Sequence, residues 1–197
     1  MKAKPLHSEQ LGVTPQDLGH RLDNPSLRRG LVWGSIGGLA GTMLMDLFGT
    51  GLFLAAGLPP SLSFSVCGDA AAGFLAWLGQ TVAGGAPLGA LLHYMIGPAL
   101  GATLGAAVTG IAGLRLDSTA KGLGLGVLFV EVVSQPLLAA AAVVLKMTPA
   151  EAVPWFGVAF AMHLVYGLVL GASLRHGLRS STLPVAQPVG QNSAKIG

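Results

Sequence analysis

Long apolar runs alternate with short polar segments along the chain of 197 residues. Four of these runs reach the length of about 20 residues that a helix needs to cross a bilayer. They predict transmembrane helices over residues 31–58, 88–113, 122–145 and 155–174. The pattern therefore predicts an all-α integral membrane protein, a four-transmembrane-helix bundle that occupies residues 29–177.

A helix-start signal precedes the last apolar run. Thr148 can cap a helix, Pro149 suits the first helical position, and Glu151 completes a capping box. We therefore expect the fourth transmembrane helix to begin with a short helical lead-in before residue 155.

Polar tails flank the apolar runs, and one mixed segment interrupts them. Residues 1–28 predict a cytoplasmic N-terminal tail, and residues 178–197 predict a disordered cytoplasmic C-terminal tail. Residues 59–87 mix apolar side chains such as Phe64 and Trp77 with many small and polar ones. We expect an interfacial or re-entrant helix there, on the outer side between the first two spans, with an ordinary outer loop as the alternative.

The composition supports a membrane location. Only 10% of the residues are charged and 52% are hydrophobic, and the mean hydropathy is +0.67. So few charges cannot cover a water-facing surface, since soluble domains carry about 25% charged residues. The net charge of +3 does not indicate a nucleic-acid partner, because the basic residues flank the apolar runs and form no stripe with aromatic residues.

The distribution of Lys and Arg predicts the orientation. Four spans would place ten of the eleven basic residues on one side of the membrane, and only Lys146 on the other. Because basic residues gather on the cytoplasmic side, we expect both termini in the cytoplasm. The ten are Lys2, Lys4, Arg21, Arg28, Arg29, Arg115, Lys121, Arg175, Arg179 and Lys195.

The second and fourth predicted spans share a pattern. Each contains a histidine, His93 or His163, followed by glycines four and eight residues later and by leucines seven and eleven residues later. The preceding spans also begin alike, with a basic residue, Gly and Leu. We interpret the bundle as two parallel helix-pair repeats related by an axis along the membrane normal, with residues 59–87 inserted in the first.

Glycines at helical spacing predict where the helices pack. Residues at i, i+4 and i+8 share one helix face, and small residues let transmembrane helices approach closely. The expected packing positions are Gly34, Gly38, Gly97, Gly101, Gly167 and Gly171.

Polar residues inside the predicted spans mark a candidate ligand or ion site, formed by Asp46, His93, Glu131, Gln135 and His163. A carboxylate at membrane depth is costly and should have a partner inside the bundle. Counting helical rise from the flanking basic residues predicts two pairs at matching depth, Glu131 with His163 and Asp46 with His93.

Three functions fit these features. The first is a non-catalytic accessory, assembly or stress-related subunit, since the chain has no Walker loop, HExxH motif or nucleophile elbow. The second is a transporter or channel for protons, metal ions or a small solute, within a homo-oligomer or a larger membrane complex. The third is a redox protein in which His93 and His163 bind a metal ion or haem b, because no CxxCH motif is present for covalent attachment.

One short motif carries a family resemblance. The segment Met162-His163-Leu164-Val165-Tyr166-Gly167, together with a glycine-rich first span, is similar to small bacterial inner-membrane proteins of the YagU-like kind. The resemblance implies a bacterial or archaeal cytoplasmic (inner) membrane protein. It implies no active-site residues.

Overall fold

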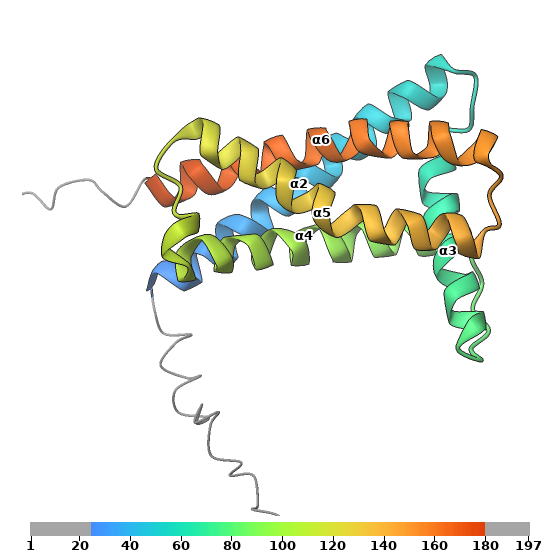
Figure 1. Ribbon diagram of the computed structural model, residues 1–197, viewed down its shortest axis with the longest axis horizontal. Helices are drawn as coiled ribbons and strands as arrows, with labels where there is room; N and C mark the ends of the chain where they lie inside the picture. The colour runs from blue at the N-terminus through green and yellow to red at the C-terminus, as the bar shows by residue number, and fades with distance from the viewer. Residues whose placement is uncertain (1–24, 180–197) are drawn as a thin grey trace, which may run out of the picture.

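The structure, a computed structural model, describes residues 25–179, and this part of the chain is helical without strands (Figure 1). Four of its helices are long and apolar enough to cross a membrane. The protein is therefore an all-α membrane protein with four candidate spans. The elements are α2 (Pro25–Ala55), α3 (Leu62–Trp77), α4 (Ala86–Gly110), the short 3₁₀ helix η1 (Ala112–Leu114), α5 (Thr119–Val144) and α6 (Pro149–Arg179).

Helix α2 begins and ends earlier than the predicted first span. Its end is set by Gly57, whose φ of 70° is a left-handed conformation that favours glycine. The turn is closed by the N–H of Leu58, which donates to the carbonyl of Phe53 at 2.8 Å. This is a Schellman arrangement, which stops the helix before the run of apolar residues ends. Most of the two predicted tails lies outside the described residues.

Helix α6 begins at the predicted helix-start signal. The backbone N–H and the hydroxyl of Thr148 both donate to a carboxylate oxygen of Glu151, each at 2.8 Å. The Glu151 half of the predicted capping box is therefore confirmed, whereas the Thr148 hydroxyl donates to the carboxylate instead of accepting from a backbone N–H. The helical lead-in expected before residue 155 is present. The helix continues to Arg179, beyond the predicted end of the span.

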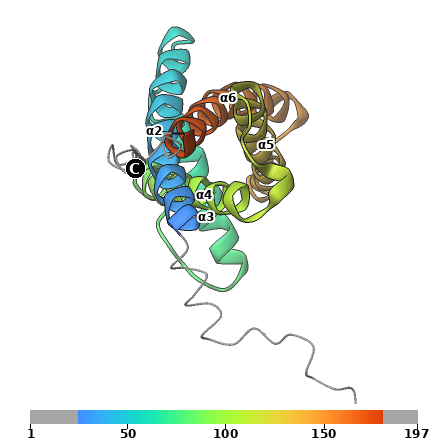
Figure 2. The same ribbon diagram turned by 90° about the vertical axis from the view of Figure 1, so that its left-hand side faces the viewer.

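The four long helices surround a common interior. Helix α2 packs against α4 on one side and α6 on the other, and α6 packs against α5. Helices α4 and α5 barely touch each other, so the bundle is closed between α2 and α6 and open between α4 and α5. The view along the helices shows this arrangement (Figure 2). Helix α3 lies across one end of the bundle and packs mainly on α4.

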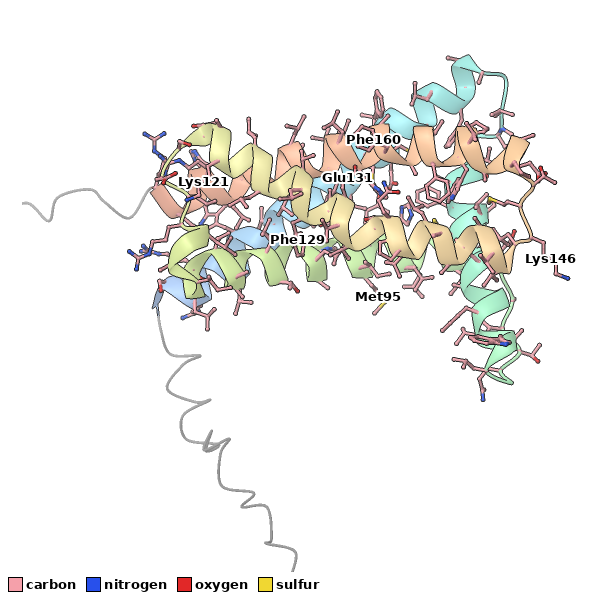
Figure 3. The ribbon with its side chains drawn as sticks, in the orientation of Figure 1. Met95, Lys121, Phe129, Glu131, Lys146 and Phe160 are labelled. Atoms are coloured by element: carbon pink, nitrogen blue, oxygen red, sulfur yellow. The ribbon has the colours of Figure 1, made fainter. Side chains whose placement is uncertain are left out.

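The two ends of the bundle differ in charge. The described chain begins and ends at the same end of the bundle, where Lys121 also lies, whereas Lys146 lies at the opposite end, beside α3 (Figure 3). At the first end Ser118 caps α5 by accepting a hydrogen bond from the N–H of Lys121 at 3.1 Å. The hydrogen bond from the Lys121 ammonium lowers the pKa of the exposed Asp117 carboxyl.

Glycines bring the backbones of α2 and α4 together. A Cβ added to Gly34 would overlap the carbonyl oxygen of Gly101, and one added to Gly38 would overlap that of Gly97. Each pair faces the other directly, so no side chain fits between them. Larger residues at these positions would force the two helices apart.

A second glycine contact joins α5 and α6. A Cβ added to Gly126 would overlap the carbonyl oxygen of Gly167, and one added to Gly171 would overlap that of Gly122. The six glycines that the sequence singles out therefore all lie at contacts between helix backbones.

Helix α3 approaches α4 in the same way. A Cβ on Gly68 would overlap the carbonyl oxygen of Gly85, and a Cβ on Gly89 would overlap that of Phe64. The Asp69 carboxylate also accepts a hydrogen bond from the N–H of Gly85 at 2.7 Å. These contacts hold α3 against the start of α4, so the segment predicted as either an interfacial helix or a loop contains a packed helix.

Candidate functional site

Three polar side chains from three helices meet near the end of the bundle that α3 covers. The Asp46 carboxylate of α2 lies 3.1 Å from Nδ1 of His93 on α4. The other ring nitrogen of His93, Nε2, lies 3.3 Å from the sulfur of Cys67 on α3. The Phe64 ring meets the His93 ring edge-on, with centroids 5.2 Å apart, and holds its orientation.

The register of the α2–α4 contact explains why Asp46 reaches His93. Gly34 faces Gly101 and Gly38 faces Gly97, so the two helices are antiparallel. A move of four residues forward along α2 therefore corresponds to a move of four residues backward along α4. The residue opposite His93 is therefore Thr42, and Asp46 lies one turn farther along the same face. The predicted contact between Asp46 and His93 is present, and the Asp46 side chain is only 7% exposed.

A cavity of about 490 Å³ lies beside this cluster. Its walls come from α2, α3, α4, α5 and α6, and they are almost entirely apolar. Ile96 of α4 and Leu137 of α5 line it and remain 44% and 59% exposed, so it opens to the outside between these two helices. The polar side chains that line it are Thr42, Cys67, His93, Ser134, Trp155, His163 and Tyr166.

Two of the cavity side chains have a buried polar atom without a hydrogen-bond partner. These atoms are Nδ1 of His163 and Nε1 of Trp155. The Tyr166 side chain, which also lines the cavity, is satisfied, because its hydroxyl donates to the carbonyl of Gly97 at 2.6 Å. Since buried polar groups are normally paired, His163 and Trp155 are the two positions where a bound molecule could supply a partner.

The predicted pair of Glu131 and His163 does not form. Gln135 donates to one carboxylate oxygen of Glu131 at 2.7 Å, and the other oxygen is buried without a partner. The register of the α5–α6 contact gives the reason, since Gly126 faces Gly167 and the residue opposite His163 is consequently Val130. Glu131 lies at the right depth, but it is turned by about 100° around the helix.

The predicted site residues therefore divide into two groups. Asp46 and His93 belong to the cluster with Cys67, and His163 lines the same cavity as His93. Glu131 and Gln135 pair with each other and do not line the cavity.

The metal and haem hypothesis finds little support in this geometry. In the described part of the chain no group of three His, Cys, Asp or Glu side chains is arranged to hold a metal ion. His93 also has a neighbour at each ring nitrogen, so neither nitrogen is free to bind iron while those contacts last. His163 alone keeps a nitrogen without a partner.

Sequence reasoning did not find Cys67, Trp155 or Tyr166 as members of the site. Cys67 is the single cysteine of the chain and lies in the mixed segment between the first two spans. No spacing relates it to His93, because the two meet only when α3 folds back on α4. The one available signal for Tyr166 was its place on the same span as His163, three residues farther along.

Comparisons of the chain with protein-family models, with curated proteins and with solved structures found no match. The resemblance to YagU-like proteins therefore stays a prediction, and the case for a function depends on the geometry of the site.

Proposed function

We propose that this protein spans the cytoplasmic membrane four times, with both termini in the cytoplasm, and binds a long-chain amphiphile such as a lipid or fatty acid in the cavity between α4 and α5. The observation that carries the proposal is the apolar cavity with its opening between the two helices that barely touch.

The charge distribution supports the proposed orientation. Lys121 lies at the end of the bundle where the described chain begins and ends, and Lys146 lies at the other end. With the first end in the cytoplasm, the basic residues follow the positive-inside rule. Helix α3 then lies at the outer surface, where the 80% exposed Trp77 would sit among the lipid headgroups.

The two glycine contacts support the proposed repeat. In each half the glycine four residues after the histidine, Gly97 or Gly167, faces a glycine of the preceding long helix. The glycine eight residues after the histidine, Gly101 or Gly171, faces the preceding glycine of that helix. The pairs α2–α4 and α5–α6 thus share one antiparallel packing register. In this register Gly122 corresponds to Gly34 and not to Gly30, so the similar starts of the two preceding spans do not coincide.

The properties of the cavity favour an acyl chain as the occupant. The opening lies between two membrane-spanning helices, so the molecules outside it are lipids. An apolar wall gives a charged or strongly hydrated solute no compensation for its lost water, whereas it suits a hydrocarbon chain. The unpaired nitrogens of His163 and Trp155 supply hydrogen bonds for a polar group at the end of that chain.

The proposed ligand role is compatible with the first hypothesis from the sequence, a non-catalytic accessory, assembly or stress-related subunit in an oligomer or larger complex. The transport hypothesis draws less support, because Glu131 and Gln135 lie away from the cavity. A path for protons or metal ions through the bundle would lack these two groups.

Ligand binding can be tested with Trp155, which lines the cavity. A double variant, Trp33→Phe with Trp77→Phe, leaves Trp155 as the single tryptophan. We expect dibrominated stearate to quench its fluorescence saturably in detergent-purified protein, because bromine quenches on contact. Ala141→Phe, which fills the cavity from α5, should abolish the saturable component.

The matched control is Ala139→Phe, since Ala139 lies on the same helix, is exposed and does not line the cavity. This variant should keep the saturable quenching. Quenching that rises linearly with probe concentration, or that is equally strong in the two phenylalanine variants, would contradict the proposal.

A further inference from the structure

Cys67, His93 and Asp46 stand in the order of a nucleophile, a base and an orienting acid. The sulfur of Cys67 is 3.3 Å from Nε2 of His93, and the opposite ring nitrogen is 3.1 Å from the carboxylate of Asp46. Cysteine proteases and other acyl-transfer enzymes use such a chain of contacts, recognised by its geometry and not by its position in the sequence.

The buried Asp46 fixes the role of each ring nitrogen. With the ring proton on Nδ1, His93 donates to the Asp46 carboxylate, and Nε2 is left as the acceptor of the Cys67 thiol proton. Transfer of that proton produces a thiolate, which is the reactive form of cysteine. The Asp46 carboxylate stabilises the positive charge that then forms on the ring.

The thiol is also in the right place to meet a ligand. Cys67 is partly exposed and lines the cavity together with His93. The unpaired nitrogens of His163 and Trp155 line the same cavity and can donate to a carbonyl oxygen of the occupant. A purely structural cysteine would need neither access to the cavity nor a histidine that is itself oriented by a carboxylate.

We propose that Cys67 takes the acyl group from a long-chain ester or thioester bound in the cavity, with His93 as general base and Asp46 as the residue that positions it; this rests on the proposed ligand site. The thiol proton passes to Nε2 of His93 and the sulfur attacks the carbonyl carbon. The bond from that carbon to the alcohol or thiol leaving group breaks. The leaving group takes the proton back from His93, and the acyl chain remains on Cys67 as a thioester. No oxidant, reductant or metal is needed.

The test uses the detergent-purified full chain and palmitoyl-coenzyme A. Because Cys67 is the only cysteine, intact-mass spectrometry should show one added palmitoyl group that neutral hydroxylamine removes. His93→Gln should slow the acylation by about 10²–10⁴-fold, the usual contribution of a general base. Asp46→Asn should slow it as well.

A relocated thiol separates the arrangement from simple cysteine reactivity. Cys67→Ser combined with Ala71→Cys moves the thiol one turn along α3, where it still lines the cavity but has lost its place beside His93. We expect this variant to acylate as slowly as His93→Gln. Equal rates for the relocated thiol and for Cys67 would overturn the proposal.

Two further measurements keep the outcomes distinct. If dibrominated stearate quenches Trp155 saturably while Cys67 takes up no palmitoyl group, the ligand site stands and acyl transfer fails; if neither occurs, both fail. Should the His93 and Asp46 variants not fold, iodoacetamide alkylation at neutral pH answers the question. Cys67 should then react at least about tenfold faster than the relocated thiol, as expected for a thiol held partly as thiolate, and equal rates would again contradict the proposal.

Discussion

The two long sides of the bundle have opposite character, although they pair helices of the same kind. On the closed side α2 meets α6 through glycines: Gly41 lies against the ring of Tyr166, and Gly49 against the side chain of Met162. On the open side α5 and α4 barely touch, and the cavity lies between them. Under the proposed repeat, Gly41 and Gly49 of α2 correspond to Phe129 and Leu137 of α5. The small residues that allow close approach on the closed side are thus replaced by bulky ones on the open side.

The two helix pairs α2–α4 and α5–α6 differ in the polar residue that lies near the histidine. Both place a histidine one turn from the glycine contact, His93 in α4 and His163 in α6. One turn beyond the residue that faces the histidine, α2 has Asp46 and α5 has Ser134. The register of the glycine contact is thus the same in both pairs, whereas a carboxylate beside the histidine is present in the α2–α4 pair and absent at this position of the α5–α6 pair.

The largest expected effect comes from making the closed side resemble the open one. A Cβ at Gly41 would lie 2.9 Å from the Tyr166 ring and 3.1 Å from the Tyr166 carbonyl oxygen, so Gly41→Leu has no room. We expect the free energy of unfolding to fall by about 3 kcal/mol or more, because overpacking against backbone cannot be relieved by a side-chain rotation. Reversible unfolding in mixed dodecyl sulfate micelles measures it.

The control for this substitution is Gly124→Leu, because an added Cβ at Gly124 meets nothing within 4 Å. Its stability should stay near that of the wild type or rise, since leucine favours a helix more than glycine does. An equal loss in both variants would show that glycine serves the helices themselves and not the contact between α2 and α6.

A smaller effect tests whether the halves share one register. Ser134→Asp should give His163 the partner that Asp46 gives His93. A double-mutant cycle with His163→Leu measures the coupling free energy between the new carboxylate and the histidine. We expect this coupling to stabilise the fold by up to about 1.7 kcal/mol, the upper range for polar pairs between membrane helices. The cycle that combines Asp46→Ser with His93→Leu should show a coupling of the same sign. A coupling near zero in the first cycle, with a clear coupling in the second, would contradict the common register.

The same registers explain how far the sequence could predict the structure. The four spans were predictable because each depends on a local run of apolar residues, and only their ends shifted, as at Gly57. The depth of a residue in the membrane was also predictable from its distance along the helix, so the pairing of Asp46 with His93 could be predicted. Depth does not give the direction around the helix, so Glu131 was wrongly paired with His163, which faces Val130.

The place of Cys67 was not predictable for a different reason. It depends on how α3 folds across the end of the bundle, through the contacts of Gly68 and Gly89 with distant backbone. A single sequence gives the spacing within each segment but not the docking of one segment on another. The opening between α4 and α5 was not predictable for the same reason, because it depends on how the two helices are placed relative to each other.

The smallest expected effect concerns the hydrogen bond between the Tyr166 hydroxyl of α6 and the backbone of α4. The Tyr166 hydroxyl donates to the carbonyl of Gly97, so α6 is tied to α4 from the closed side while the cavity stays open beside it. Tyr166→Phe should lower the free energy of unfolding by only about 0.6 kcal/mol, the average for such bonds in membranes, because a helical carbonyl that loses this donor keeps its backbone partner. Tyr166→Ala should cost several times more in the same unfolding assay, since it also removes the ring that covers Gly41. If the two variants lose the same stability, then the hydrogen bond from the hydroxyl to α4 would hold α6 in place, and the packing of the ring against Gly41 of α2 would contribute nothing.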